Sequence, residues 1–121
     1  MPELILFSPA TIEELENFLG ASAIKSCMLD PIPAKIFKSC FSVLLPIIKK
    51  IVNKSLAHAV VPVKFKEAAL TPILKKQSQD HELFLNFRPI SNLRFVSKVV
   101  EKVVAARLIS HVNNNNLNEL L

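Results

Sequence analysis

The sequence predicts an α+β fold that is mainly helical and contains one small β-hairpin. Apolar residues recur at the i, i+3, i+4 spacing of a helix in several segments. Two other segments combine apolar residues with a proline and are expected to be extended, the first of them as an edge strand. Of the 121 residues, 50% are hydrophobic, which permits a buried core and argues against disorder. We therefore expect one folded unit of ordinary domain length.

A first short helix is expected over residues 11–19. Thr11 and Glu14 have the spacing of a capping box, in which each side chain accepts a hydrogen bond from the other residue's backbone N–H. The apolar residues of this stretch recur at helical spacing, namely Ile12, Leu15, Phe18 and Leu19. Gly20, the only glycine in the chain, stands where a helix C-terminus favours glycine.

Prolines shape the next two predicted helices. The two prolines of residues 31–33 hold the backbone extended, and a helix is expected to run from Pro33 through Cys40. Pro46 marks a break or the first turn of a new helix. The amphipathic helix that follows ends at residues 60–62. Its apolar face has Ile47, Ile48, Ile51, Val52 and Leu56, and its polar face has Lys49, Lys50, Asn53 and Lys54.

Two extended segments are expected to pair as a hairpin with a long connection. Residues 68–74 are apolar and contain Thr71 and Pro72. Proline cannot donate to a sheet ladder, so this segment is predicted to be an edge strand. Residues 75–86 are polar and loop-like, and residues 87–93 form the second extended segment.

The most regular helical pattern follows the hairpin, and its apolar stripe is expected to be core rather than a site. Four consecutive asparagines at 113–116 end this helix, because asparagine competes for the backbone's own hydrogen bonds. The stripe consists of Val96, Val99, Val100, Val103, Val104, Leu108 and Val112.

The composition excludes some classes of protein. No segment approaches the roughly 20 apolar residues of a membrane-spanning helix, and the first residues do not resemble a signal peptide. We therefore expect a cytoplasmic or nuclear protein that does not insert into a membrane. Cys27 and Cys40 are then free thiols, and the cysteines and three histidines have no metal-ligand spacing.

Charge is unevenly distributed along the chain. Up to Ala34 there are five acidic residues and one lysine, a net of −4, whereas from Lys35 onward there are fourteen basic and five acidic residues, a net of +9. A basic segment of this kind favours a polyanionic partner. Without a motif, a merely solvated lysine-rich surface explains it equally well.

Three runs, in order along the chain, carry a resemblance to a known family. They are DPIP at residues 30–33, NKSLAHAVVPVKFKEAALTPILKK at 53–76, and NFRPISNL at 86–93. Together they resemble the N-terminal, fingers-side part of reverse transcriptases of non-LTR (LINE-type) retrotransposons. Phe65 stands where that family has tryptophan, and Ala59 to Val61 replace the glycine expected before Pro62.

The resemblance implies an incomplete right-hand polymerase fold. Residues 1–29 would be a helix and loop that precede the fingers, and residues 30–121 would be the fingers portion with its hairpin, truncated before the palm and thumb. The complete family enzyme performs RNA-directed DNA synthesis with Mg²⁺ held by palm carboxylates. Those carboxylates are absent from this sequence, so we expect no catalytic residue, no bound metal and no activity of this chain alone. Asp30 is expected to have a helix-entry or turn role beside Pro31.

The resemblance also assigns the binding residues. Arg88, in the Arg-Pro-Ile-Ser run, is expected to grip the phosphates of the incoming nucleotide, because guanidinium binds phosphate through two parallel bonds. Lys75 and Lys76 are expected to contact the nucleotide or the template, although two solvated lysines are an equally good interpretation. Expected template contacts are Lys64, Lys66 and Arg94. Two phenylalanines could stack on a base; core packing is favoured for Phe87, and Phe84 is undecided.

The expected partners follow from these assignments. RNA or single-stranded DNA would bind weakly and without sequence preference, and the incoming nucleotide would bind only in a complete enzyme. The apolar faces of the helices over 47–56 and 96–112 would partly pack on the palm, so without it we expect self-association or a molten state. Two alternatives stay open: a non-catalytic nucleic-acid- or protein-binding helical module derived from such an element, and a helical domain whose basicity means little.

Overall fold

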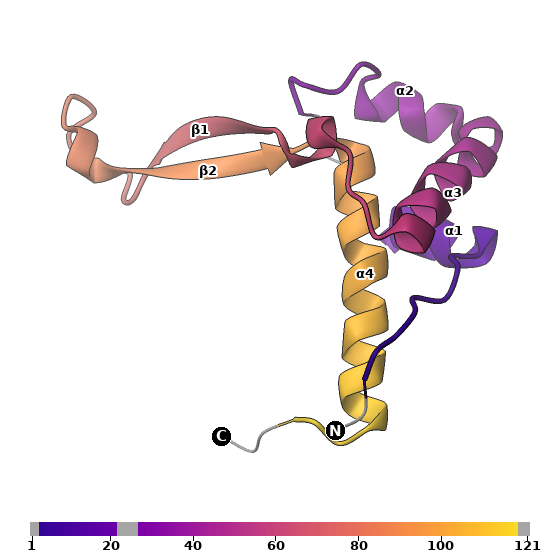
Figure 1. Ribbon diagram of the computed structural model, residues 1–121. Helices are drawn as coiled ribbons and strands as arrows, with labels where there is room; N and C mark the ends of the chain where they lie inside the picture. The colour runs from indigo at the N-terminus through magenta and orange to yellow at the C-terminus, as the bar shows by residue number, and fades with distance from the viewer. Residues whose placement is uncertain (1–2, 22–26, 119–121) are drawn as a thin grey trace.

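The computed structural model describes residues 3–21 and 27–118 and shows an α+β fold, as predicted. A body of four helices carries one antiparallel hairpin that projects from it (Figure 1). In chain order the elements are α1 (Ile12–Ala21), α2 (Ala34–Ser39), α3 (Phe41–His58), a 3₁₀ turn η1 (Val63–Lys66), β1 (Ala68–Leu74), a second 3₁₀ turn η2 (Phe84–Asn86), β2 (Phe87–Leu93) and α4 (Phe95–Asn114).

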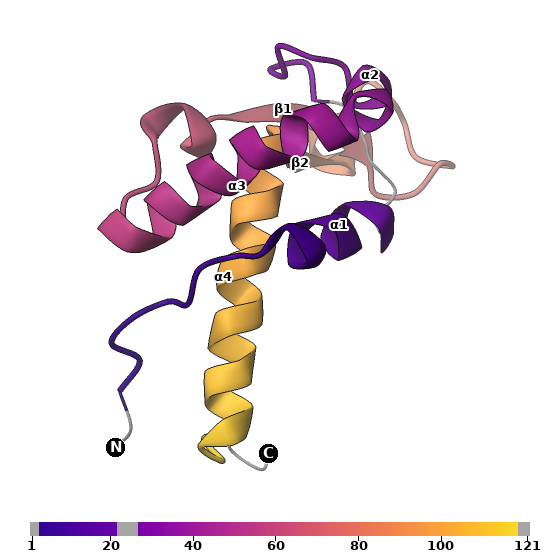
Figure 2. The same cartoon turned by 90° about the vertical axis from the view of Figure 1, so that its right-hand side faces the viewer.

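The core forms where α1 and α3 pack against each other and against the same side of α4 (Figure 2). Each of these three helices supplies one side chain that is 0% exposed, namely Leu15, Val52 and Val103. Burying an aliphatic side chain of this kind stabilises the fold by roughly 1.5–3 kcal/mol. The short helix α2 joins the core through Phe37, whose ring centroid lies 4.5 Å from that of Phe95 at the start of α4.

The apolar stripe of α4 is core over only part of its length. Val99, Val100 and Val103 are buried, but Val112 is only half-buried and Leu108 is 46% exposed. The prediction that the whole stripe is core was therefore wrong at its C-terminal end. Figure 2 shows the reason, since α1 and α3 cross the upper part of α4 and its lower part extends beyond them.

The interruption between the second and third helices lies at Cys40, not at Pro46 as predicted. Cys40 leaves helical geometry with φ −101° and ψ 19°, and α3 then runs continuously through Pro46. A proline inside a helix removes one backbone hydrogen bond, here to the carbonyl of Ser42. Both Ser42 and Pro46 are exposed, so water can solvate that carbonyl.

The N-terminal segment is held against the body by polar contacts that the sequence patterns misassigned. Thr11 Oγ1 accepts from the Glu14 N–H at 3.2 Å, which is half of the predicted capping box. The Glu14 carboxylate instead binds the Arg107 guanidinium through both of its oxygens. Arg107 also donates to the backbone carbonyls of Ser8 and Pro9, at 3.2 and 3.1 Å.

Asn53 makes the second of these attachments. Its side chain accepts from the Ala10 N–H at 2.7 Å and donates to the Ala10 carbonyl at 3.2 Å, as a neighbouring strand would. Asn53 is half-buried by this contact, and Ala10 is fully buried. The prediction that Asn53 lies on the solvent face with the α3 lysines was therefore wrong, because a tertiary partner overrides the helical pattern.

The hairpin has the strand boundaries that the sequence predicted. Its register runs from Ala68 opposite Leu93 to Leu74 opposite Phe87. Just beyond β1, the Lys75 N–H donates to the Asn86 carbonyl at 2.8 Å. Lys75 and Asn86 are therefore a hydrogen-bonded pair of the ladder. Such pairs alternate with non-hydrogen-bonded ones along an antiparallel ladder.

The alternation explains how two prolines fit in one hairpin. Pro72 lies directly opposite Pro89 at a non-hydrogen-bonded position. An N–H at such a position points away from the partner strand, so neither proline removes a ladder bond. Each instead removes a donor from one outer edge of the hairpin, which makes the addition of a further strand less favourable at both edges.

Helix α3 ends at a residue in a left-handed conformation. Ala59 has φ 51° and ψ 37°, and the Val60 N–H donates to the Ser55 carbonyl at 3.2 Å. Glycine is the residue that usually closes a helix in this way, because its lack of a Cβ removes the steric penalty. Helix α3 therefore ends with a strained alanine at a position where a helix end favours glycine.

We expect Ala59→Gly to raise the free energy of unfolding by about 1 kcal/mol, because it removes the left-handed penalty of a Cβ. The matched control is Ala57→Gly, which lies two residues earlier at an exposed position inside α3. That change should lower the free energy of unfolding by about 0.5–1 kcal/mol. Urea unfolding followed by circular dichroism measures both, and equal destabilisation by the two variants would contradict the conformational argument.

Candidate nucleic-acid interface

The hairpin is positioned by Asp30, which lies far from it in sequence. One carboxylate oxygen of Asp30 accepts from the Phe95 N–H at 2.8 Å, and the other accepts from the Cys27 N–H at 3.0 Å. Phe95 begins α4, so the carboxylate satisfies one of the unpaired N–H groups of that helix and complements its positive end. Asp30 thus has a local turn role, as expected, and also caps a helix 65 residues away.

A second contact attaches the same loop to the hairpin. The Cys27 thiol, which is buried and free, donates to the Asn92 carbonyl at 3.3 Å. The Asn92 side chain in turn accepts from the Lys98 ammonium at 2.6 Å. The last residues of β2 and the first turn of α4 are therefore fixed together, which sets the direction in which the hairpin projects.

Arg88 and Lys75 lie on one exposed face of the hairpin. Arg88 is directly opposite Ile73, and Lys75 follows Ile73 by two residues, so Lys75 and Arg88 are diagonal neighbours. Lys75, Lys76 and Arg88 all have exposed side chains. Lys76 begins the loop, where its backbone is fixed by Gln79 through bonds of 3.1 Å in each direction. The structure therefore brings the three predicted nucleotide-binding residues together at the outer part of the hairpin.

The predicted template-binding residues form a separate group at the base of the hairpin. Lys64 and Lys66 are exposed on η1. Arg94 is different, because its side chain is only 21% exposed and pairs with Glu67 at 3.1 Å. Arg94 is separated from Arg88 by six residues of extended chain, which corresponds to about 20 Å. The two predicted groups do not form one continuous site.

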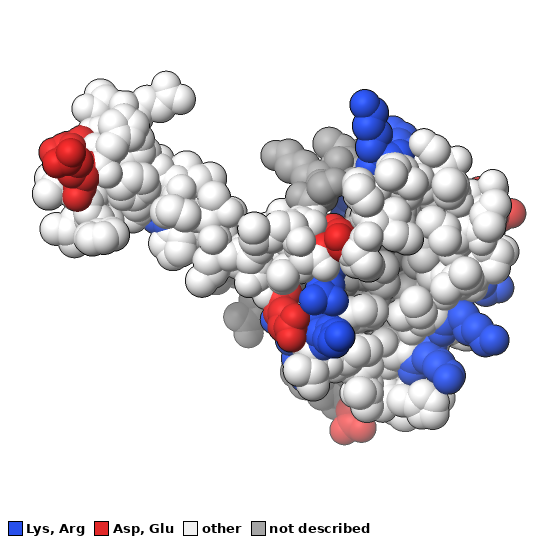
Figure 3. All heavy atoms as spheres, turned by 90° about the horizontal axis from the view of Figure 1, so that it is seen from above, with Lys and Arg blue, Asp and Glu red and all other residues white. Residues whose placement is uncertain are grey.

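The loop at the far end of the hairpin contains two acidic residues and an exposed phenylalanine. Figure 3 shows acidic side chains there, and the loop contains Asp80 and Glu82. Asp80 organises this loop, because its side chain accepts from the Glu82 N–H and its carbonyl accepts from the Asn86 side chain, both at 2.9 Å. Phe84 is 95% exposed at this end, whereas Phe87 is half-buried within the strand pair and does not join the helical core.

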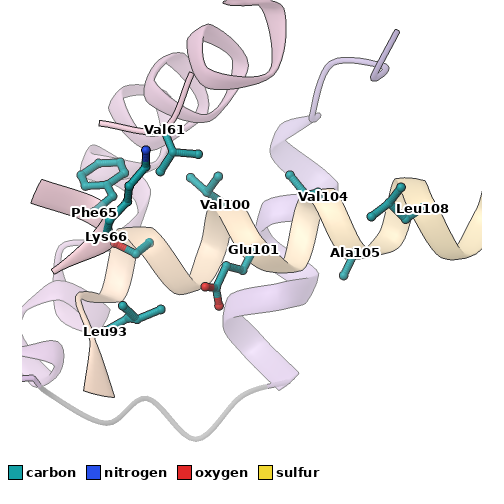
Figure 4. Close-up of a pocket in the computed structure, with 10 residues that line it drawn as sticks. Val61, Phe65, Lys66, Leu93, Val100, Glu101, Val104, Ala105 and Leu108 are labelled. Carbon is teal, nitrogen blue, oxygen red and sulfur yellow. The ribbon is translucent and has the colours of Figure 1, made fainter. Parts of the chain in front are cut away.

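An apolar groove lies along α4, and the sequence patterns did not indicate it (Figure 4). Its volume is about 490 Å³, within the range of small-molecule pockets. Ser97 faces it with a buried hydroxyl that has no hydrogen-bond partner among the described residues. The apolar stripe of α4 was the one sequence feature related to this groove. A periodic pattern shows which side of a helix is apolar but not how far neighbouring helices cover it, so the groove itself could not be predicted. The lining residues are Val61, Phe65, Lys66, Leu93, Ser97, Val100, Glu101, Val104, Ala105 and Leu108.

The carboxylates of the described residues do not suit the Mg²⁺ that the resemblance implies for a complete enzyme. Within residues 3–21 and 27–118 no group of three or more His, Cys, Asp or Glu side chains could hold a metal ion. Both oxygens of Asp30 already accept backbone N–H groups, and Asp80 is used within its own loop. In the same part of the chain, no helix is long and apolar enough to cross a membrane.

A search of the chain against models of known protein families found no match. The assignment of a function therefore depends on the residues and their arrangement.

We expect Asp30→Ala to destabilise the protein by about 1–2 kcal/mol and to loosen the hairpin base, because it leaves two backbone N–H groups without acceptors. Asp30→Asn should have a smaller effect, since the amide oxygen can still accept from one of them. Hydrogen exchange at the Cys27 and Phe95 amides should speed up in both variants. Asp80→Ala, in the exposed loop, is the control; faster exchange at Phe95 in that variant, or none in Asp30→Ala, would contradict the capping role.

Self-association is expected to involve the uncovered stripe of α4. Leu108→Gln places an amide in the apolar groove, so we expect the apparent mass in concentration-dependent sizing to fall toward that of a monomer. Phe84→Gln removes a more exposed apolar side chain at the other end of the molecule and should change the apparent mass less. A monomeric parent protein at every concentration, or an effect of Phe84→Gln alone, would refute the prediction.

Proposed function

We propose that this chain is the fingers-side part of an RNA-directed DNA polymerase of the LINE type, and that its hairpin binds the triphosphate of the incoming nucleotide. The sequence resemblance over residues 30–116 supports the parent function. The placement of Arg88 beside Lys75 on one exposed hairpin face supports the nucleotide-binding role.

The chemistry of this face suits a triphosphate. A guanidinium offers parallel N–H donors that match two phosphate oxygens, and an ammonium adds a compact charge that can follow a neighbouring phosphate. Pro89 fixes φ directly after Arg88 and so restricts the backbone that carries the guanidinium. The neighbours of Arg88 on this face are Ile73, directly opposite it, and Ile90, two residues further along β2, so neither is a carboxylate that would compete for the cations.

These residues hold a substrate and do not activate a primer hydroxyl. The carboxylates that would hold the two metal ions are expected from a palm supplied by another part of such an enzyme. The role of this chain is then to bind and orient the nucleotide, while template contacts come from its remaining basic surface.

The full nucleotide site is expected only in a complete enzyme, but the cationic face of the hairpin is present in this chain, and its contact with a triphosphate can be tested on the chain itself. Titration of a deoxynucleoside triphosphate at low salt, without added metal, should shift NMR signals around residues 73–75 and 87–90. Arg88→Ala should weaken this binding by about tenfold, the size of a lost charge-assisted hydrogen bond. Arg88→Lys should restore it only partly, because the paired donors are lost.

The control for this experiment is Lys38→Ala, an exposed cation on α2 away from the hairpin. It should leave the dissociation constant almost unchanged. NMR signals that shift only elsewhere in the chain, or equal affinities of the parent protein and Arg88→Ala, would contradict the proposal that the hairpin binds the nucleotide. Primer extension on an RNA template by the chain alone, above a no-protein background, would contradict its role as an incomplete enzyme.

A further inference from the structure

One stripe of α3 carries three lysines along a shallow hollow. The hollow has a volume of about 570 Å³ and lies between α3 and the start of α1. Its α3 residues follow one another at spacings of one, three or four positions, so they form a single stripe about 17 Å long. The lining residues are Ile12, Pro46, Lys49, Lys50, Asn53, Lys54 and Ala57.

The wall of the hollow is fixed by the contact already described between Asn53 and Ala10. That pair of hydrogen bonds, 2.7 and 3.2 Å long, holds the chain just before α1 against the middle of α3. Ile12 therefore stays beside the stripe, and the hollow is a defined feature of the fold rather than a gap between independent elements. Asn53 has a structural role here, and the neighbouring lysines are left to face solvent.

The charge in the hollow is of one sign. Lys49, Lys50 and Lys54 line it, and none of the lining residues is acidic. The two ion pairs found among the described residues are Arg94–Glu67 and Arg107–Glu14, so neither uses a lysine of the stripe. Lys49 is half-buried. A half-buried lysine typically lays its aliphatic stem along apolar surface and keeps its ammonium in water.

We propose that this lysine stripe of α3 binds the sugar-phosphate backbone of single-stranded nucleic acid, with the sugars against the apolar floor of Pro46 and Ile12. The inference rests on the proposed function, because it names the surface that holds the template. It replaces the weaker candidates at the hairpin base, where Arg94 is already paired. The lining of the hollow supports the choice, since it has three cations and no acidic residue. Figure 3 shows basic side chains on several parts of the helical body.

Such a contact has a measurable electrostatic signature. A protein that neutralises phosphates of a single strand releases counterions, and the slope of log affinity against log salt is about −0.7 for each phosphate neutralised. Three lysines therefore contribute about −2 to the slope. Binding of this kind carries no sequence preference, because it contacts the backbone and not the base edges.

The experiment compares two triple variants that lower the net charge equally. Lys49→Gln, Lys50→Gln and Lys54→Gln together remove the stripe, whereas Lys64→Gln, Lys66→Gln and Lys75→Gln remove three cations of the hairpin side. Fluorescence anisotropy with a labelled oligouridine, at several salt concentrations, gives the affinity and the slope. We expect the stripe variant to bind at least about tenfold more weakly at low salt and to lose about 2 from the slope, and the hairpin-side variant to keep most of both.

Each outcome separates the inference from the proposed function. If only the hairpin-side variant loses affinity and slope, the stripe assignment is wrong and a nucleic-acid role survives. If the parent protein does not bind the oligonucleotide at low salt, the inference and the template part of the proposed function both fail. Binding of a polyglutamate peptide as tight as that of the oligonucleotide, lost in the stripe variant, would overturn the nucleic-acid assignment in favour of an acidic protein partner.

Folding of the variants is checked by thermal melting. Should the triple change disturb α3, Lys50→Gln with Lys54→Gln is the second variant, since both positions are exposed. It should lose about two thirds of the slope difference, or about 1.4. A slope equal to that of the parent protein would then overturn the proposal.

Discussion

The carboxylate of Asp30 connects two parts of the chain that lie 65 residues apart in the sequence. Through Cys27 and Phe95 it connects the loop before α2 to the first turn of α4, and the Cys27 thiol extends the connection to the end of β2. An isolated two-stranded hairpin is marginally stable in water, so the hairpin depends on how its base is held. Its direction, and thus the position of Arg88, depends on this capping contact.

The outer part of the hairpin must remain an independent arm, and its sequence favours that. Two exposed edges would normally invite pairing with another chain. Pro72 and Pro89 each remove an outward donor, and they lie opposite each other where the ladder loses nothing. Charges at the base add a cross-strand attraction, because Glu67 and Arg94 continue the register beyond Ala68 and Leu93. The arm is thereby ordered at its base and protected along its edges.

The strands could be predicted because proline, apolar alternation and polar flanks act locally, and their boundaries were correct. Errors arose where a side chain has both a local and a distant use. Glu14 has the spacing of a capping box, yet its carboxylate accepts two charge-assisted hydrogen bonds from Arg107 in place of the single bond from the Thr11 N–H that a capping box would provide. Asn53 belongs to a polar helical face, yet it binds Ala10.

The remaining errors concern how far one helix covers the apolar side of another, which is decided only when the whole chain has folded. The stripe of α4 shows which side is apolar but not where α1 and α3 stop covering it. The groove beside Leu108 therefore could not be found by periodicity. The same applies to the six candidate binding residues, since spacing along the chain does not reveal that three lie at the outer hairpin and three at its base.

This separation of charges has a consequence for how nucleotide and template would be held. Between residues 75 and 88 the cations Lys75, Lys76 and Arg88 are offset by Asp80 and Glu82, a net of +1, so this end has little long-range attraction for a polyanion. Interactions between exposed charges are largely screened beyond about 8 Å at physiological ionic strength. Arg88 and Lys75 can therefore act only on a phosphate group brought directly to them. The α3 stripe has three cations and no acidic lining residue, which suits the proposed contact with several phosphates of a strand. On the proposed assignment, affinity for the strand comes from the rigid helical body, and selectivity for the position of a triphosphate comes from the arm. Because the Asp30 contact fixes the arm to the body, the proposed nucleotide and strand sites keep a constant position relative to each other, although no residue contributes to both.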